Sequence, residues 1–403
     1  MKITNEWQNL LTDHARKNLS ILDAIKRNKD ISRTEISRIT GLNIVTVSNY
    51  VNSYIEKGLV IEKGLDISSG GRRPAIVELN PEYCYVIGVE LGLRHVRAIL
   101  TNLNSEIICS VEYERPRQGE KAVVEILYKC LHDLLAKSEK DVSKIKGMCV
   151  AASGVIDKEA GTVHCTFGIV SVYLPINELL EKEFGIPTMI ENDATAAAYG
   201  EWSLGLGHVT DIKVLLYMYS GVGCGIITNG EIYEGASGTA GEPSVREVPD
   251  EAKPVWLDNR SPIAPWAIDL WICEDIKDAI QKGKQSKVKD LVDGKLDKIN
   301  LKTVFAALRE GDTLSKEIIE KAAKNLGIKI SFLVNLFNPD MVVIGGGIEG
   351  GGAVIVDAVK ETVRKYAFEE MSNVVRIIPA RLGENGACLG ASCLVVRRIF
   401  ASI

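Results

Sequence analysis

The chain has 403 residues, of which 46% are hydrophobic and 25% charged, and its formal net charge is −5. These values are typical of an ordinary folded globular protein of about two to three domains, and they argue against a disordered, collagen-like or coiled-coil chain. The negative charge also argues against a basic coat for nucleic acid or acidic membranes. Residues 1–80 differ from the rest, because they hold 12 Lys and Arg against 9 Asp and Glu.

Residues 1–80 carry the pattern of two short helices joined by a tight turn, as in a helix-turn-helix. Ser32 and Glu35 fit a capping box, which satisfies backbone N–H groups at a helix N-terminus. That helix should end at Gly41, and Asn43 can cap the helix that follows, which should end at Gly58. We expect each helix to bury an apolar stripe, made of Ile36 and Ile39 in the first and of Val47, Val51, Tyr54 and Ile55 in the second.

A two-stranded wing follows the second helix. Short apolar runs at residues 59–62 and 75–79 flank a tip rich in Gly and Ser, which is the pattern of paired strands. At the base of this wing, Arg72 and Arg73 could reach phosphates or a narrow minor groove. The segment is therefore interpreted as a winged helix-turn-helix domain that binds double-stranded DNA, and a small protein-interaction module of three helices is the alternative.

If DNA is the partner, the helix over residues 43–57 lies in the major groove. The side chains expected to face the DNA are Ile44, Val45, Thr46, Ser48, Asn49 and Asn52. Asn49 and Asn52 are the candidates for base edges, because an Asn amide can pair bidentately with adenine. Thr46 would lie near a phosphate, and the two aliphatic side chains could offer only apolar contact. Any one of these exposed side chains could equally lack a partner.

From residue 81 onward the chain has the pattern of an α/β protein. The first half predicts strands at 83–91, 96–103 and 106–113, a helix at 120–138, a strand at 145–152, a helix at 176–184 and a strand at 187–191. The pattern then restarts with strands at 214–219 and 222–227, helices over 262–335 and a strand at 341–347 that runs into three glycines. Two such halves indicate a duplicated fold around a cleft.

Four segments of this body resemble the ROK family of repressors, open reading frames and sugar kinases. They are Ile190–Ala197 (IENDATAA), the Tyr219–Gly225 turn, Asn338–Gly347 and Gly383–Ala391 (GENGACLGA). The resemblance extends from about Tyr83 to Ala401, and the preceding winged helix places it in the repressor branch. It implies an actin-like, ribonuclease-H-like body of two lobes that closes on a sugar and is usually dimeric.

The resemblance also implies three domains. Residues 1–80 form the winged helix-turn-helix, residues 81–194 with 384–403 form the first α/β lobe, and residues 195–383 form the second lobe, which carries dimerisation and part of the sugar pocket. A homodimer or higher oligomer would read a pseudo-palindromic operator, since the two-fold symmetry of the protein is mirrored in its site.

A kinase of this family needs a phosphate loop of pattern D-x-G-x-T, and this chain departs from it. The aligned stretch runs from Glu90 to Arg94, with a longer acid in place of the Asp, Leu93 in place of a small residue and Arg94 in place of a hydroxyl. Leu93 and Arg94 would occupy the space of the γ-phosphate and its metal. We therefore expect no catalytic residue, no kinase activity and no cofactor, although Asp193 is retained at the family's base position.

The zinc module that shapes the sugar pocket in this family is also expected to be missing. The family has a His shortly after an Ala-Gly-Glu segment and then three clustered Cys. Here Val245 follows Ala240–Glu242 where the His would stand, and the next Cys, Cys273, is alone. No metal site is therefore expected. The glycine turn from Gly221 to Gly225 is kept, and it could cradle phosphate or simply close a hairpin.

Sugar recognition can survive the loss of catalysis. By resemblance, Asn192, Asp193 and Glu242 belong to the pocket, and Ser153 and Gly154 lie at a strand end that faces the cleft. Such convergent donors and acceptors suit the hydroxyls of a sugar ring. The leading hypothesis is a repressor of carbohydrate-utilisation genes with a small sugar effector bound between the lobes. The alternatives are an ATP-dependent sugar kinase that carries a DNA-binding domain and a constitutive DNA binder with a vestigial pocket.

The distribution of Cys and of apolar residues predicts a cytoplasmic protein that does not bind membranes. The nine Cys are scattered singly, as expected of buried thiols in a reducing compartment. Residues 1–11 contain Lys2 and Glu6 where a signal peptide needs an apolar core, and the uncharged stretch at 214–230 is Gly-rich and shorter than the roughly 20 apolar residues of a spanning helix.

Overall fold

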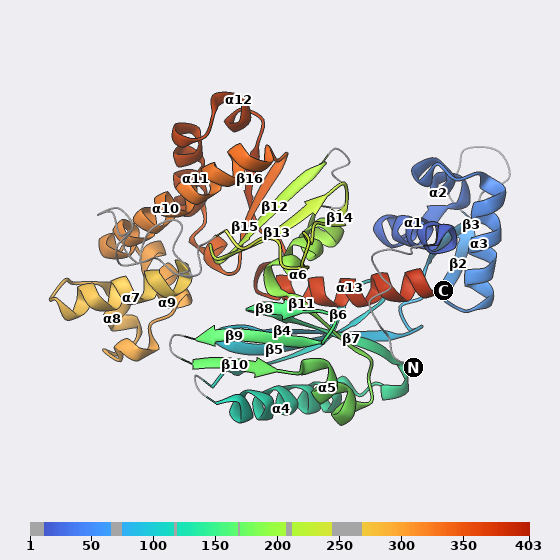
Figure 1. The fold of residues 1–403 in the computed structure, drawn as a ribbon, viewed down its shortest axis with the longest axis horizontal. Helices are drawn as coiled ribbons and strands as arrows, with labels where there is room; N and C mark the ends of the chain where they lie inside the picture. The colour runs from blue at the N-terminus through green and yellow to red at the C-terminus, as the bar shows by residue number, and fades with distance from the viewer. Residues whose placement is uncertain (1–11, 66–74, 117–118, 168–169, 207–211, 244–267) are drawn as a thin grey trace. The chain divides into compact units, whose positions relative to one another are not determined.

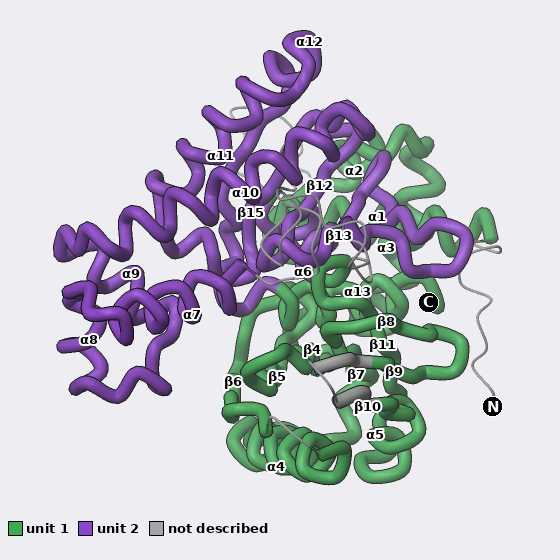
Figure 2. Tube along the Cα trace, turned by 60° about the vertical axis from the view of Figure 1, so that its left-hand side comes forward, with its two compact units in different colours: residues 1–196, 206–208, 387–403 green, residues 197–205, 209–386 purple. Residues whose placement is uncertain are grey.

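The computed structural model describes residues 12–65, 75–116, 119–167, 170–206, 212–243 and 268–403. The chain divides into two compact units (Figure 2), of which unit 1 holds residues 1–196, 206–208 and 387–403 and unit 2 holds residues 197–205 and 209–386. Each unit has its own five-stranded sheet and its own hydrophobic core.

The first part of unit 1 is the predicted winged helix-turn-helix (Figure 1). Its elements are α1 (Asp13–Asn28), β1 (Ile31–Ser32), α2 (Arg33–Thr40), α3 (Ile44–Glu56), β2 (Val60–Leu65) and β3 (Ala75–Leu79). The capping box of Ser32 and Glu35 is confirmed, and Gly41 ends α2 in the left-handed conformation at φ 69°. Asn43 caps α3, because its Oδ1 accepts from the backbone N–H groups of Val45 and Thr46 over 2.7 and 3.3 Å.

The buried stripes of these helices are confirmed except at Ile39, which is exposed, and at Ile55, which is only half-buried. Ile36 of α2 and Val47, Val51 and Tyr54 of α3 are at most 1% exposed, whereas Ile39 is 47% exposed. The expectation for Ile39 is therefore wrong. Ile39 lies about 60° around the helix from Ile36, on the side opposite to the half-buried Ser37 and Thr40, so it falls at the exposed edge of the face that α2 buries.

The remainder of unit 1 is an α/β layer. Its sheet has the order β11-β7-β4-β5-β6, in which β4, β5 and β6 form an antiparallel meander and β7 and β11 run parallel to β4. The strands are β4 (Tyr85–Leu91), β5 (His95–Asn102), β6 (Ile107–Glu114), β7 (Ile145–Ala152) and β11 (Thr188–Asn192). A small second sheet holds β8 (Val155–Asp157), β9 (Thr162–Phe167) and β10 (Val170–Leu174).

Helices cover both faces of this sheet. Figure 1 shows α4 (Glu120–Ser138) and α5 (Ile176–Phe184) on one face and α13 (Gly386–Ser402) on the other. The approach of α13 requires a glycine in β4, because a Cβ on Gly88 would lie 2.0 Å from the carbonyl oxygen of Cys388. The helix α6 (Asp193–Gly200) begins directly after β11, and a turn of 3-10 helix, η1 (Val142–Lys144), precedes β7.

We expect Gly88→Ala to lower the free energy of unfolding by about 1–3 kcal/mol, because the new methyl group overpacks the contact between β4 and α13. Urea denaturation of the full chain measures this change. Gly386→Ala, which lies on α13 itself, is the matched control, since a Cβ there meets nothing closer than Tyr217 Oη at 3.6 Å. Equal effects of the two substitutions would contradict the steric argument.

Unit 2 repeats the strand order of unit 1. Its sheet has the order β14-β13-β12-β15-β16, with β12 (Val214–Tyr219), β13 (Gly223–Thr228) and β14 (Glu231–Ile232) antiparallel and β15 (Met341–Gly345) and β16 (Arg376–Pro379) parallel to β12. The duplicated α/β fold expected from the sequence is confirmed by this repetition.

The helices of unit 2 are α7 (Ile268–Gln281), α8 (Lys287–Leu291), α9 (Leu301–Arg309), α10 (Thr313–Phe337), α11 (Ala353–Tyr366) and α12 (Glu369–Ser372). Shorter helical turns are η2 (Glu201–Gly205), η4 (Leu296–Lys298), η5 (Ile348–Gly351) and η6 (Gly383–Asn385). Among the helices of the described ranges, none has the length and the apolar character needed to cross a membrane. Eight Cys whose side chains the structure describes, namely Cys84, Cys109, Cys130, Cys149, Cys224, Cys273, Cys388 and Cys393, are free thiols, and among these eight Cys109 alone is partly exposed.

Candidate functional site

The outer face of α3 carries the residues that the sequence assigned to DNA. Ile44 and Val45 are 44% and 62% exposed, Asn49 and Asn52 are also exposed, and Thr46 and Ser48 are half-buried. The opposite face of the helix is buried in the core of the winged helix. The six side chains therefore lie on α3 as predicted by helical periodicity. Arg72 and Arg73 lie outside the described residues.

Asn49 and Asn52 differ in whether their side-chain amides are available for hydrogen bonds to a DNA base. Asn52 Oδ1 accepts a hydrogen bond from Arg33 Nη2 over 3.1 Å, and the same nitrogen lies 3.2 Å from Glu62 Oε2 on β2. A bidentate pair with adenine needs both the oxygen and the nitrogen of the amide, so Asn49 is the better candidate. Sequence reasoning missed Arg33, because nothing in the local spacing indicates a partner 19 residues further along the chain.

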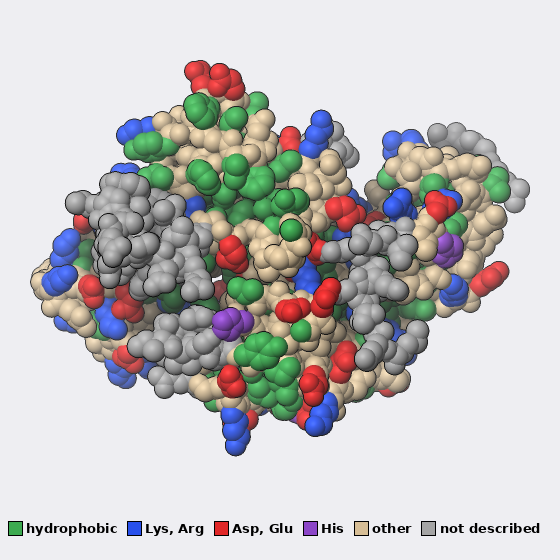
Figure 3. Space-filling model, in the orientation of Figure 1, with side chains coloured by type: hydrophobic (Ala, Val, Ile, Leu, Met, Phe, Trp, Pro, Cys, Tyr) green, Lys and Arg blue, Asp and Glu red, His purple; other side chains and the backbone are tan. Residues whose placement is uncertain are grey.

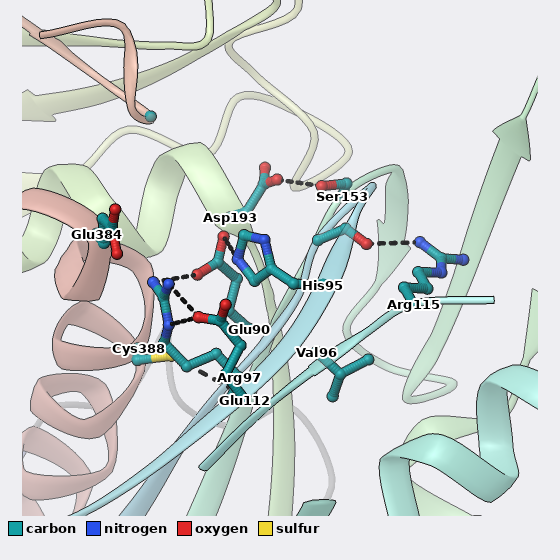
Figure 4. Close-up of polar contacts among 12 residues, drawn as sticks. Glu90, His95, Val96, Arg97, Glu112, Arg115, Ser153, Asp193, Glu384 and Cys388 are labelled. Atoms are coloured by element: carbon teal, nitrogen blue, oxygen red, sulfur yellow. Dashed lines mark hydrogen bonds and ion pairs between the residues drawn. The ribbon is translucent and has the colours of Figure 1, made fainter. Parts of the chain in front are cut away.

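The predicted pocket residues of unit 1 meet where three parallel strands end. Leu91 of β4, Ala152 of β7 and Asn192 of β11 are in register, so the residues that follow β7 and β11 lie next to one another. In open α/β sheets, ligands bind at such carboxyl ends. Ser153 follows β7 and donates its hydroxyl to Asp193 Oδ2 (Figure 4).

Asn192 and Gly154 complete this group. Asn192 Nδ2 donates to the Gly154 carbonyl over 3.3 Å, and Asn192 Oδ1 accepts from the backbone N–H groups of Ala194 and Thr195. The amide oxygen of Asn192 is therefore committed to the N-terminus of α6. The structure brings Ser153, Gly154, Asn192 and Asp193 together, and Glu242 belongs to unit 2.

Asp193 is a buried carboxyl with an elevated pKa. Its residue is 6% exposed. Burial raises the pKa of Asp193 to about 6, the hydrogen bond from Ser153 lowers it in part, and the negative charge of Glu90 raises it further. At pH 7 most of the molecules therefore carry an ionised Asp193, which can accept hydrogen bonds from hydroxyl groups of a ligand.

We expect ligand affinity at this site to fall as the pH drops below about 6, because protonation removes the charged acceptor. If only the ionised form binds, affinity at pH 5 should be roughly tenfold weaker than at pH 7. Isothermal titration calorimetry, in which a sugar that binds the full chain is added at pH 5 and at pH 7, measures this change in affinity. Affinity that is the same at pH 5 and pH 7 would contradict the role of the ionised carboxyl.

A line of charged residues crosses the neighbouring meander. Strand register places Glu90 opposite Arg97 and Arg97 opposite Glu112. Arg97 Nε donates to Glu112 Oε2 over 2.6 Å, and Arg97 Nη1 lies 3.7 Å from Glu90 Oε2. Glu90 and Arg97 are 3% and 7% exposed. Figure 4 shows these side chains beside Asp193.

His95 adds a further contact to this charged line. His95 Nε2 lies 3.2 Å from Glu90 Oε1. Burial of the ring lowers the pKa of His95, but the hydrogen-bonding interaction and the charge of Glu90 outweigh burial, so that the pKa is raised overall. Opposite charges at paired strand positions attract one another, so the sequence did contain a signal for these contacts. Using that signal requires the register of the strands, which the strand ranges alone do not give, and for this reason His95, Arg97 and Glu112 were not among the predicted site residues.

The turn between β4 and β5 is held in place from β6. Gly92 N donates to His95 O over 3.0 Å, which closes the turn around Leu93 and Arg94. Arg115, which is 5% exposed, donates from Nη1 to the Gly92 carbonyl and from its backbone N–H to the Arg94 carbonyl, each over 2.8 Å. The side chain of Leu93 is 39% exposed at the tip of the turn.

In unit 2, the glycine turn contacts a buried lysine that the sequence did not reveal. Lys329 of α10 is 6% exposed and donates from Nζ to the Gly221 carbonyl over 2.7 Å. Burial lowers the pKa of Lys329 to about 8, against the opposing influence of Cys224 and Glu242. Glu242 therefore lies within electrostatic reach of this turn. In the part of the chain that the structure describes, no group of His, Cys, Asp and Glu could hold a metal ion, and Val245 lies outside that part.

Comparison with known proteins gives two matches to family models. A model of the ROK family matches residues 86–245 and 276–398. A model described as winged helix-turn-helix DNA-binding matches residues 15–61. The chain is also 31% identical, over 383 residues, to the xylose repressor of Caldicellulosiruptor bescii, and the match covers 94% of each protein.

Two solved structures show the same fold. One is a ROK family transcriptional regulator described as a homologue of the E. coli MLC protein, with a TM-score of 0.73 and 20% identity over 96% of this chain and 98% of that one. The other is a ROK family glucokinase from Streptomyces griseus in complex with glucose and AMPPNP, with a TM-score of 0.66 and 23% identity over 77% of this chain and 98% of that one.

Proposed function

The chain belongs to the ROK family and carries a winged helix-turn-helix of the DNA-binding kind, and on this premise we propose that it is a sugar-responsive repressor of genes for carbohydrate use. The effector is a small sugar that hydrogen-bonds to Asp193, with Ser153, Gly154 and Asn192 as further pocket residues. Since a relative that covers 94% of the chain is named a xylose repressor, xylose is the first sugar to test.

The observation that carries this proposal is that one unit holds both the winged helix and the Asp193 site. The C-terminal half of helix α13 contacts the winged helix. Lys57 Nζ donates to the Ile403 carbonyl over 3.0 Å, and Lys26 Nζ lies 3.7 Å from Cys393 Sγ. The position of the winged helix therefore depends on α13.

The same helix contacts the charged line beside Asp193. Near the N-terminal end of α13, Cys388 Sγ lies 3.5 Å from the carbonyl oxygen of Arg97, and Arg97 pairs with Glu90. A ligand that rearranges these strand ends can thus act on the winged helix through side chains in direct contact. Coupling of about 1–3 kcal/mol between the sites would change operator affinity some 5- to 150-fold, which suffices for a switch.

The residues at the phosphate-loop position do not fit a nucleotide. Kinases of this family place a metal-bound triphosphate at this turn, where the acid must be free for the metal and backbone N–H groups must be free for the phosphates. Here the carboxylate of Glu90 faces His95 and Arg97, and the backbone N–H of Gly92 already donates to the His95 carbonyl. This arrangement supports the proposal that kinase activity has been lost, and no step through a nucleotide is assigned.

The proposed partner on the DNA side is a pseudo-palindromic operator bound by a homodimer. Asn49 contacts a base edge, Thr46 a phosphate, and Ile44 and Val45 make apolar contacts in the major groove. Arg72 and Arg73 of the wing contact phosphates or the minor groove. The two half-sites are then separated by about 34–36 Å or a multiple of that distance.

The test is operator binding by the full chain, measured by fluorescence anisotropy with and without xylose and other pentoses and hexoses. We expect one sugar of the panel to change the operator dissociation constant at least about fivefold. If no sugar alters operator affinity and none raises the melting temperature, the chain is a constitutive DNA binder and the proposed effector role is wrong.

The competing function is an ATP-dependent sugar kinase, which is favoured by the retained Asp193 and by the fold shared with the glucokinase. Incubation of the full chain with Mg²⁺, ATP and the same sugars decides between the two. Turnover above about 1 per second would overturn the repressor assignment in favour of an enzyme.

A further inference from the structure

A network of three side chains fixes the orientation of the Asn52 amide on the outer face of α3. Arg33 Nη2 donates to Asn52 Oδ1 over 3.1 Å and to Glu62 Oε2 over 3.2 Å. Because a guanidinium nitrogen can only donate hydrogen bonds, it holds the amide oxygen of Asn52 on the side of α2 and β2. The amide nitrogen of Asn52 therefore lies on the side of the amide that is turned away from Arg33.

This amide nitrogen is available to a ligand. Asn52 is exposed, and its Nδ2 donates to no atom of the residues that the structure describes. Asn49, three residues earlier, lies on the same face of α3. Since this is the face proposed to enter the major groove, Asn52 presents hydrogen-bond donors to the bases, whereas its acceptor is already engaged.

The position of Arg33 is itself set by the elements around it. Arg33 is the first residue of α2 and directly follows Ser32, whose capping box with Glu35 fixes the start of the helix and which also pairs with β3. The side chain of Arg33 is 23% exposed, and Glu62 on β2 balances its charge. The guanidinium is thus held in place before DNA binds, so that little conformational entropy is lost when Asn52 contacts a base.

An amide that can only donate discriminates among the four bases. In the major groove, guanine presents two acceptors, N7 and O6, and cytosine presents a donor. Adenine presents an acceptor beside a donating amine, and thymine an acceptor beside a methyl group. Guanine therefore suits the fixed Asn52 amide best, because neither a competing donor nor a methyl group stands beside its acceptors. An amide that was free to offer both its oxygen and its nitrogen would instead select adenine.

The surface of the winged helix carries charges of both signs. In Figure 3, basic side chains (blue) and acidic side chains (red) are interspersed where Figure 1 places the winged helix, and residues 1–80 hold 12 Lys and Arg against 9 Asp and Glu. Such a surface favours few phosphate contacts, and these carry no sequence information. Preference for one operator then depends on contacts to base edges, of which the Asn52 contact is one.

We propose that Arg33 is a positioning residue that orients Asn52 to recognise guanine. The inference rests on the proposed function for the binding of DNA by α3, and it deepens that function by naming a base. Asn49 and Asn52 are about 4.5 Å apart along the helix axis, which is close to the spacing of about 3.4 Å between successive base pairs. The guanine therefore lies next to the base pair that Asn49 contacts.

The first test measures the base preference of the wild type. The full chain selects its operator from a library of random duplex DNA, and fluorescence anisotropy then gives the affinity for every single base-pair substitution of that operator. The base pair at which Asn52→Ala loses discrimination is the one that Asn52 contacts. There we expect guanine to be preferred over adenine at least about threefold, since one hydrogen bond contributes a factor of roughly 2 to 12. A preference for adenine, or no base pair affected by Asn52→Ala, would overturn the proposal.

The second test changes the donors and acceptors that the side chain offers. Arg33→Ala frees Asn52 Oδ1, so the preference at the same base pair should change from guanine to adenine. Asn52→Asp keeps the contact with Arg33 but offers only acceptors, so the preference should change to cytosine, whose N4 donates. This nearly isosteric variant is informative even if Arg33→Ala does not fold. Arg38→Ala is the matched control, because it removes the same charge from an exposed position of α2 and should leave every base preference as it is.

A phosphate contact by Arg33 would give a different result. In that case Arg33→Ala weakens binding to all operators equally and reduces the slope of log affinity against log salt concentration by about 1. Such a uniform loss, with the preference for guanine unchanged, would overturn the role of Arg33 in positioning Asn52.

Failure of this proposal can be told apart from failure of the proposed function. If the full chain selects no duplex over unrelated DNA, the proposed function is wrong and the inference falls with it. If a sugar alters affinity for the selected operator but neither Arg33→Ala nor Asn52→Asp changes a base preference, only the role of Arg33 is wrong. If both preferences change but no sugar alters operator affinity, the role of Arg33 stands and the sugar-responsive function falls.

Discussion

Replacement of Asp193 by Ala is expected to abolish the effect of sugar on operator binding while operator binding itself remains. The substitution removes the ionised acceptor at the carboxyl ends of β7 and β11, together with the hydrogen bond from Ser153. It does not touch α3, which carries the DNA-facing residues. Operator titrations with and without the effective sugar measure both quantities in one experiment.

The fold should tolerate this substitution. Because the pKa of Asp193 is raised to about 6 from 3.8, the folded state binds more protons than the unfolded state between about pH 4 and 6, and ionisation of Asp193 destabilises the fold at higher pH. Loss of the carboxyl relieves that cost. Asp157→Ala on the neighbouring strand β8 is a suitable control, and it should respond to sugar as the wild type does. An Asp193→Ala variant with an unchanged sugar response would remove Asp193 from the pocket.

Replacement of Asn49 by Ala is expected to weaken specific operator binding far more than non-specific binding. A bidentate contact to a base edge is worth about 1–3 kcal/mol, which corresponds to a loss of roughly 5- to 150-fold in affinity for the operator. Non-specific binding depends mainly on phosphate contacts, which Asn49 does not make. Competition of labelled operator with unrelated duplex DNA measures the two affinities separately.

Two variants on the same helix sharpen this test. Glu56→Ala changes an exposed residue at the end of α3 and should leave the ratio of specific to non-specific affinity as it is. Asn52→Ala should have a smaller effect than Asn49→Ala, because Asn52 Oδ1 already accepts from Arg33. Equal losses of specific and non-specific binding in the Asn49 variant would exclude a base contact.

The sequence determined those features that depend on neighbours within one or two turns or along one strand. The Ser32–Glu35 capping box, the Asn43 cap and the left-handed end at Gly41 are local hydrogen-bond and backbone requirements, and each is present as expected. The alternation of apolar strands and helices likewise predicted the five strands of the larger unit 1 sheet and three strands of the unit 2 sheet, because burial of a strand or a helix face leaves a periodic pattern in the sequence, but it missed the short strands β14 and β16.

Only the tertiary structure decided which side chains meet. Glu90 faces Arg97 and His95 because the register of the β4–β5 hairpin places them there, and Lys329 reaches Gly221 across 108 positions of the chain. Ile39 is an apolar residue that the sequence analysis placed in a buried stripe, yet it is 47% exposed. Its exposure depends on whether another element packs over that part of the helix face, and no local pattern of residues contains this information, because the packing partner comes from a distant part of the chain.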